Sequence, residues 1–382
     1  MNKSCLIGFL MCSAFSLVVQ AATDGAHITK TISQIERKKG IKRTIQYRPD
    51  GNDFVCVNGK NRYTRALYGG ITDFRIETSD RPVFATYKPK DSKHICFRLQ
   101  CGNQSIALDS LKFCEARYRA GRRTYRLTDP LLGKGELNIS VLAFPDAEGG
   151  IWRFTMKDMP EGALLHCYIS EIRAKNLSRN GDMGADRADS FDAPQLPKEQ
   201  KHYKLSLDGT TAYIVVEDQE LRLPALVEGT SLYDKSEKWR SEIESSLQIS
   251  TPDPYFNPLG GALAAAADGI WDGKIWLHGA IGWRSQLNGW RAAYIGDFIG
   301  WHDRARTHFD SYAASQVTDV PATIPHPTQD TALHLARSVK KWGTPHYSNG
   351  YICRTPYRKD QMHHYDMNLC YIDELLWHFN WT

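Results

Sequence analysis

The stretch LYDKSEKWRSEIESSLQISTPDPYFNP (232–258) decides how the chain divides. Charged and apolar residues alternate through 232–250 with the spacing of an amphipathic helix, whereas 251–258 is rich in proline. Proline breaks helices and pushes the residue before it into extended backbone. We therefore predict a helix over 232–250 followed by a Pro-rich joint, with regions of different character on either side.

Short alternating stretches fill the chain from about residue 40 up to this helix. Examples are FRIET (74–78), LNISVLAF (137–144), TAYIVVED (211–218) and LRLPALVEG (221–229). Many short strands bounded by Gly, Asn, Asp or Pro are typical of an antiparallel β-sandwich. The polar, Gly- and Pro-containing segment 178–200 predicts a long surface loop.

Helical patterns follow the joint. We expect helices in GGALAAAADGIWD (260–272), in GWRAAYIGDFIGWHDRARTHFDSYAASQV (289–317) and in DTALHLARSVKKW (330–342). The final stretch, 365–382, repeats apolar residues at helical spacing with no closing Gly or basic turn. It predicts an element cut off within a domain, so we expect the chain to be a fragment. Helices joined by loops rich in Trp, Gly, His and Tyr favour an α/α toroid whose loops line a pocket.

The predicted fold is thus an N-terminal antiparallel β-sandwich followed by the first part of an (α/α)6 toroid. Lys3, the apolar run 5–19 and Val19-Gln20-Ala21 predict a cleaved export signal. We expect a periplasmic or extracellular protein without membrane insertion, because no other stretch approaches the length of a membrane span. The expected divisions are a signal peptide (1–21), the sandwich (22–231), the linker helix with its joint (232–258) and the incomplete toroid (259–382).

Composition excludes several classes of partner. The net charge of +5 is small and scattered. The densest basic run, RAGRRTYR (119–126), accompanies no nucleic-acid motif, so we expect a solvated strand face and no nucleic-acid partner. His302 and His308 lie six apart, and no HExxH, CxxC, Walker or GxGxxG motif occurs. We expect neither metal nor cofactor, and the sequence leaves the oligomeric state open.

Tryptophan marks the candidate site. Eight of the ten tryptophans follow residue 270, and five fall between Trp271 and Trp301 among charged residues. Indoles either fill a core or stack on sugar rings in a concave site. The interleaved charges favour the second interpretation, since a dry core rarely accepts so many ionisable groups. The candidate substrate-binding residues are Trp283, Trp290, Arg291, Tyr294, Trp301, His302, Asp303 and His364.

Two carboxylates are the catalytic candidates. If 289–317 is one helix, Trp290, Tyr294, Asp297 and Trp301 share a face. Apolar neighbours raise a carboxyl pKa toward the value of an acid catalyst, so Asp297 is the first choice. The alternative is that Asp297 caps a helix or pairs with a nearby arginine. Asp366 is the second candidate, and its alternative role is to cap the last helix.

The segments GWRAAYIGDFIGWHDRA (289–305) and YDMNLCYIDELLWHFNWT (365–382) resemble the six-hairpin glycosidase superfamily. This superfamily includes glucoamylase-like, rhamnosidase-like and trehalase-like enzymes, and the likeness extends to large secreted polysaccharide-degrading proteins of Bacteroidetes. The resemblance implies a carbohydrate substrate and hydrolysis by two carboxyl groups. A complete toroid has many more helices than this chain supplies. We therefore expect the chain as it stands to have little or no hydrolase activity.

Two other functions fit the same residues. One is a carbohydrate-binding module without chemistry. The other is a polysaccharide lyase, which needs a Tyr or His base and a cation that neutralises a uronate. Its candidate residues are Tyr294, His302, Arg291, Tyr357 and Arg358.

Overall fold

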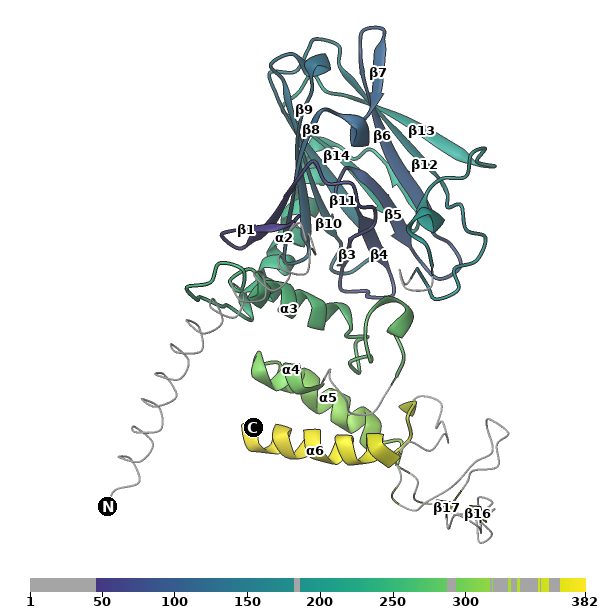
Figure 1. The fold of residues 1–382 in the computed structure, drawn as a ribbon, viewed down its shortest axis with the longest axis vertical. Coiled ribbons are helices and arrows are strands. Elements are labelled where there is room, and N and C mark those ends of the chain that lie inside the picture. Colours follow the sequence, from purple (N-terminus) through teal and green to yellow (C-terminus); the bar gives the residue numbers. More distant parts are fainter. Residues whose placement is uncertain are drawn as a thin grey trace, which may run out of the picture.

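The computed structural model describes residues 46–181, 186–286, 293–316, 318, 329–330, 335–336, 350, 352–356 and 365–382. Within these residues two antiparallel sheets precede a set of helices, so the expected order of β then α is confirmed (Figure 1). That the helices begin a toroid stays a prediction. The predicted export signal lies outside the described residues.

The eight-stranded sheet, here sheet A, has the order β1-β2-β8-β9-β10-β11-β14-β15. Its strands are β1 (Arg48–Asp50), β2 (Asp53–Val57), β8 (Phe113–Arg119), β9 (Arg122–Thr128), β10 (Glu136–Ala143), β11 (Gly149–Lys157), β14 (Thr211–Glu217) and β15 (Glu220–Arg222). Sheet B has the order β13-β12-β6-β5-β4-β3, and β7 pairs with β6. Its strands are β3 (Arg65–Tyr68), β4 (Arg75–Thr78), β5 (Val83–Tyr87), β6 (Lys93–Cys101), β7 (Gln104–Ala107), β12 (Leu164–Glu171) and β13 (Gln200–Ser206).

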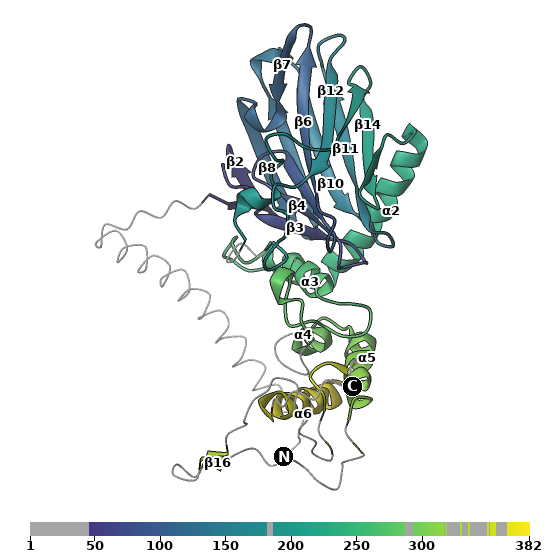
Figure 2. The ribbon, with the colours of Figure 1, turned by 90° about the vertical axis from the view of Figure 1, so that its right-hand side faces the viewer.

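The two sheets enclose one apolar core (Figure 2). Strand β9 shows the cause, because every second residue is buried and the residues between them are only half-buried. Phe84 of sheet B lies edge-on to Tyr125 and Trp152 of sheet A, with ring centroids 5.7 Å apart in each pair. Phe97 meets Phe154 at 5.5 Å. These aromatic pairs join the inner faces of the sandwich.

Helix α2 (Leu226–Ser245) packs on the outer face of sheet A against β10, β11 and β14. The predicted helix is confirmed, but it begins earlier than 232, within the stretch 221–229 that we expected to be a strand. Strand β15 ends before Pro224, which cannot donate to a sheet ladder. Gly229 allows the helix to approach closely, since an added Cβ would lie 2.3 Å from a ring carbon of Tyr213.

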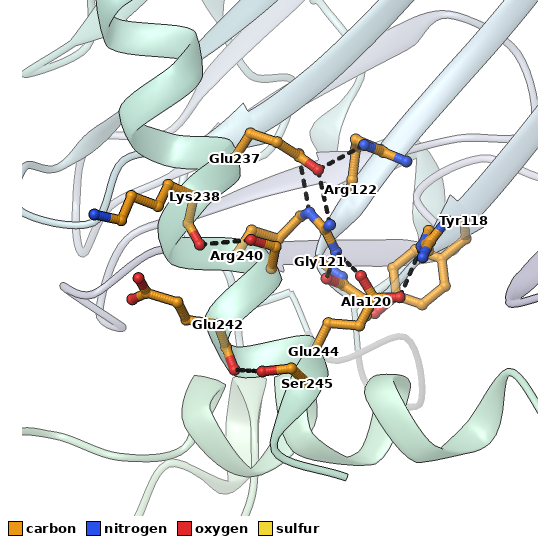
Figure 3. Close-up of polar contacts among 12 residues, drawn as sticks. Tyr118, Ala120, Gly121, Arg122, Glu237, Lys238, Arg240, Glu242, Glu244 and Ser245 are labelled. Carbon is orange, nitrogen blue, oxygen red and sulfur yellow. Dashed lines mark hydrogen bonds and ion pairs between the residues drawn. The ribbon is translucent and has the colours of Figure 1, made fainter. Parts of the chain in front are cut away.

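A network of ion pairs joins α2 to the β8–β9 hairpin (Figure 3). The Arg240 side chain is 5% exposed and donates to Glu237 at 2.8 Å and to Glu244 at 2.7 Å. From the hairpin, Arg119 binds Glu244 and Arg122 binds Glu237, each at 2.7 Å. The network fixes the linker helix to the sandwich.

The basic run 119–126 is not wholly a solvated face, which corrects the expectation. Arg123 is fully buried, donates to the Ser79 carbonyl at 3.0 Å and lies 3.7 Å from the Asp80 carboxylate. The alternation of β9 points Arg123 inward together with Tyr125. A buried cation requires such partners.

The helices after the joint are α3 (Leu259–Gly269), α4 (Ala293–Phe298), α5 (His302–Ala313) and α6 (Tyr365–Trp381). Helices α3 and α6 confirm two of the predictions. A single helix over 289–317 is wrong, because Gly300 adopts a left-handed φ of 79° and separates α4 from α5. Within 330–342, the described residues belong to strands β16 (Gln329–Asp330) and β17 (Leu335–Ala336) instead of a helix.

Helices α4, α5 and α6 lie against one another (Figure 1). Phe309, Tyr312 and Tyr371 belong to the apolar cluster of this region. Among the described helices, none combines the length and apolar character needed to cross a bilayer. The Trp-rich segment contributes Trp276 to this small helical core, and Trp271 and Trp301 pack against it.

Candidate functional site

Asp297 lies at the centre of the helical core. Its side chain is 6% exposed, and its Oδ1 lies 2.8 Å from Nδ1 of His302 and 3.0 Å from Nδ1 of His378. An ionised carboxylate only accepts, so both imidazoles donate to it. One residue from each of α4, α5 and α6 thus meets at a single carboxylate. His378 was missed from the sequence, because it lies 81 positions from Asp297 and no local spacing links them.

This geometry orients the imidazoles. With Nδ1–H directed at the carboxylate, a neutral ring keeps its lone pair on Nε2. The His302 side chain is 38% exposed, while that of His378 is 10% exposed. The arrangement can therefore present one partly exposed imidazole as a proton acceptor. The proposed role of Asp297 as a catalytic acid stays a prediction, and so does that of His302 as a sugar ligand.

Tyr294 contacts helix α6. Its hydroxyl donates to Oδ2 of Asp373 on α6 at 2.8 Å. That hydrogen bond raises the pKa of Tyr294 to about 12. The neighbouring Glu374 is also buried, with 1% of its surface exposed.

Trp301 already has a cation on its ring. The guanidinium of Arg304 lies 4.3 Å from the Trp301 centroid and 5.7 Å from that of Trp271. Arg304 also pairs with Asp268 at the end of α3, at 2.8 Å. Burial raises the pKa of Asp268, and the arginine offsets part of that effect. This stack joins α3 to α5, so one face of Trp301 is occupied by the protein itself.

Trp276 belongs to the core. Its ring is fully buried and lies against Gly296 of α4, where an added Cβ would come within 2.2 Å of the indole. The backbone N–H of Trp276 donates to Nδ1 of the buried His308 at 3.1 Å. The core interpretation therefore holds for Trp276, and stacking on a sugar stays a prediction for the other rings.

Among the described tryptophans of this segment, Trp283 has an exposed ring. It ends the short 3-10 helix η4 (Ile281–Trp283), and half of its surface is accessible. The Arg179 guanidinium, from the sandwich loop after β12, lies 4.4 Å from the ring centroid. His278 contacts the ring edge-on, with centroids 5.7 Å apart. These two contacts orient the indole while leaving much of it accessible.

Arg284, the next residue, joins the sandwich to the helical part. Its side chain is 9% exposed and donates at 2.9 Å to the Gly269 carbonyl, the Thr72 hydroxyl and the Asp73 carboxylate. The Thr72 hydroxyl in turn donates to the Trp271 carbonyl at 2.7 Å. The loop between β3 and β4 is thereby fixed to the Trp-rich segment.

A polar cleft of about 480 Å³ opens at this junction. It combines two carboxylates, two guanidinium groups, hydroxyls and an amide. The lining residues are Asp73, Asp272, Leu277, Arg284, Ser285, Gln286, Arg354 and Thr355. Such a set can accept from and donate to many hydroxyl groups at once. We did not foresee this cleft, since its residues come from three separate parts of the chain.

The remaining candidates are Asp303, Asp366 and five residues that lie outside the described part of the chain. The side chain of Asp303 is 97% exposed, and the nearest Arg306 nitrogen is 3.9 Å away. Asp366 lies in the first turn of α6, but its side chain is outside the described part. The other candidates outside the described residues are Trp290, Arg291, Tyr357, Arg358 and His364. Their roles stay predictions.

Within the described ranges, no group of three or more His, Cys, Asp or Glu side chains is arranged to hold a metal ion. The seven cysteines of this part are free thiols. Burial raises the pKa of Cys96 to about 11 and that of Cys114 to about 12. These two thiols are therefore poor nucleophiles at neutral pH.

A family model described as "Domain of unknown function (DUF4450)" matches residues 89–216, which run from the loop before β6 to β14. No curated protein matches. Among solved structures, a bacterial glucoamylase complexed with acarbose is similar, with 9% identity and a TM-score of 0.35. The match covers 69% of this chain and 55% of that enzyme. A likeness of this size does not assign a fold family.

Proposed function

We propose that this protein binds complex polysaccharide or oligosaccharide at the junction between the sandwich and the helices, as part of a secreted glycoside hydrolase. The binding proposal rests on the exposed and oriented side chain of Trp283. Its ring is 50% exposed, and Arg179 and His278 fix its orientation. A rigid, accessible indole beside converging polar groups is the arrangement that saccharide sites require.

The junction cleft supplies those polar groups. Arg284 follows Trp283 directly and lines the cleft with Asp73 and Asp272. The Arg284 guanidinium donates one hydrogen bond to Gly269, at the end of α3, and another to Thr72 of the sandwich. A ligand stacked on the indole would therefore meet preorganised donors and acceptors, which lowers the entropic cost of binding.

The hydrolytic part of the proposal rests on the resemblance of 289–305 and 365–382 to six-hairpin glycosidases. Hydrolysis needs one carboxyl group that protonates the leaving oxygen and a second that activates water or attacks. Asp297 accepts hydrogen bonds from two imidazoles, a geometry that suits a positioning group better than a proton donor. This observation favours a second candidate, a carbohydrate-binding protein without chemistry of its own.

The lyase alternative has less support. A Tyr base must lose its proton easily, and the hydrogen bond to Asp373 raises the pKa of Tyr294 to about 12. Release of an unsaturated uronide, measured by its absorbance, would support a lyase and contradict the hydrolase.

The proposed function is tested by Trp283→Ala, with Trp377→Ala as a matched control, because the two indoles are 50% and 48% exposed. Binding of soluble polysaccharides is measured by affinity electrophoresis, and hydrolysis by release of reducing ends. We expect Trp283→Ala to weaken binding by at least about tenfold, in line with the loss of one stacked aromatic anchor. Equal binding by both variants and the parent would refute the site. Binding without release of sugar would favour the non-catalytic candidate.

A further inference from the structure

A second groove lies on the sandwich and shares no lining residue with the junction cleft. It has a volume of about 790 Å³ and runs beside the ends of β5, β12 and β13 under the loop that follows β12. Its apolar floor includes Tyr87, Ile169, Ile172 and Leu177. A groove of this size accommodates several sugar residues, and the apolar patches suit their less polar faces.

Charge distinguishes this groove from the junction cleft. Six cationic and four anionic side chains line it. Three of the four acids are already engaged. Asp91 pairs with Lys93, Glu220 pairs with Lys201, and Glu171 accepts from two backbone amides at 198 and 199.

Three lysines of the groove remain available. Lys90, Lys175 and Lys198 are exposed, and within the described residues their ammonium groups form no ion pair. Lys90 has a left-handed φ of 69°, so the bend before β6 fixes the direction in which its side chain leaves the chain. Unpaired cations along a groove attract an anionic ligand and favour it over a neutral one.

The groove is connected to the proposed sugar site through one loop. Asn176, Leu177 and Asn180 line the groove, and Arg179 of the same loop lies over Trp283. A hydrogen bond from the buried Arg75 to the Asn180 carbonyl holds this loop against sheet B. Asp186 accepts from the backbone amides of residues 178, 179 and 181. We therefore expect a chain seated on Trp283 to reach the groove by passing over residues 176–181.

We infer that the ligand is an acidic polysaccharide, whose carboxylate or sulfate groups bind Lys90, Lys175 and Lys198 while a sugar ring stacks on Trp283. The inference rests on the saccharide binding proposed above and adds the chemical class of the saccharide. It also assigns a second, cationic binding surface on the sandwich.

The test compares charged polymers with neutral partners of the same backbone. Polygalacturonate is compared with its methyl ester for carboxylates, and dextran sulfate with dextran for sulfates. The triple variant Lys90→Gln, Lys175→Gln, Lys198→Gln is measured against the parent at low and high salt. We expect on the order of a tenfold loss of affinity for one anionic polymer at low salt, and a weaker salt dependence. Whichever anionic polymer responds identifies the acidic group.

A matched control removes the same charge elsewhere. Lys134, Lys157 and Lys238 are exposed and do not line the groove. Their triple change to Gln should leave affinity within about twofold, since remote surface charges are largely screened. Equal losses in both triple variants would overturn the inference. Equal affinity for charged and neutral polymers would do the same, as would equally tight binding of single-stranded DNA.

The two proposals fail separately. If Trp283→Ala weakens binding of the neutral polymers and the groove variant changes nothing, only the acidic-ligand inference falls. If Trp283→Ala changes nothing with any polymer, the junction site itself falls.

Discussion

The guanidinium of Arg179 lies over the indole of Trp283, with its central carbon 4.4 Å from the ring centroid. Arg179 belongs to the sandwich and Trp283 to the Trp-rich segment, so the contact spans the two regions. A cation on an aromatic face is worth roughly 0.5–2 kcal/mol, depending on its exposure. The pair therefore holds an accessible indole at the junction, next to the cleft that contains Arg284.

Asp297 is expected to support the helical core. Asp297→Asn loses the charge that accepts from His302 and His378, and one amide group would have to replace two charge-assisted contacts. We expect a loss of about 1–3 kcal/mol in the free energy of unfolding, measured by urea denaturation. Asp303→Asn, at a 97% exposed carboxylate, should remain within about 0.5 kcal/mol. Unchanged stability with abolished sugar hydrolysis would instead establish Asp297 as a catalytic group.

Gly296 is expected to be irreplaceable at the contact between α4 and Trp276. In Gly296→Ala the new Cβ would lie 2.2 Å from the buried indole, which has no space to move. Overpacking of this kind costs about 1–3 kcal/mol, so the melting temperature should fall. Gly209→Ala is the control, because nothing lies within 4 Å of its added Cβ. A melting temperature equal to that of the control would show that α4 does not pack as described.

Arg240 is expected to hold the linker helix on the sandwich. Its guanidinium binds Glu237, Glu244 and the Ala120 carbonyl, and removal would leave two carboxylates with fewer partners. We expect Arg240→Ala to cost about 1–3 kcal/mol, whereas Lys238→Ala on the exposed side of α2 should be neutral. Hydrogen exchange over 226–245 provides the measurement. Unchanged protection of α2 in Arg240→Ala would contradict the claim that the Arg240 ion pairs hold this helix on the sandwich.

His308 predicts sensitivity to acid. Burial lowers its pKa from 6.5 to about 3, so the folded protein keeps this imidazole neutral. Below pH 6.5 the unfolded chain gains a proton that the folded chain does not, and stability therefore falls as pH decreases toward 3. The slope approaches about 1.4 kcal/mol per pH unit for one such group. His94 and His166 have lowered pKa values for the same reason and act in the same direction.

His308→Asn isolates this contribution, because the amide oxygen can still accept from the Trp276 N–H. Urea unfolding at pH 7.5, 6.5 and 5.5 (about two pH units) should show a smaller loss of stability in the variant than in the parent. Parallel pH profiles would show that His308 is protonated in the folded state.

The sandwich was predictable because several of its strands alternate between a buried and a less buried face. Strand β9 alternates buried and half-buried residues, and period-two alternation is a property of the sequence itself. The sequence does not show that the predicted helix over 289–317 is divided into α4 and α5, because the apolar spacing continues across Gly300. A glycine is tolerated within a helix or ends it, and only packing against α6 distinguishes the two.

The sequence predicts the region of the candidate site, but it does not predict which residues of that region are exposed. Trp276 and Trp283 occur in similar sequence surroundings, yet one is fully buried and the other is half-exposed. Burial depends on which helices pack against each ring. The partnership of Asp297 with His378 and the junction cleft likewise join distant segments, and a single sequence carries no signal for such contacts.

The central claim is that a saccharide covers Trp283. Oxidative labelling of tryptophan, read residue by residue by mass spectrometry, tests it directly with and without saturating polysaccharide. We predict that the ligand protects Trp283 and leaves the comparably exposed Trp377 and Trp381 of α6 unchanged. Saturated binding with Trp283 labelled as fast as in the free protein would contradict the account.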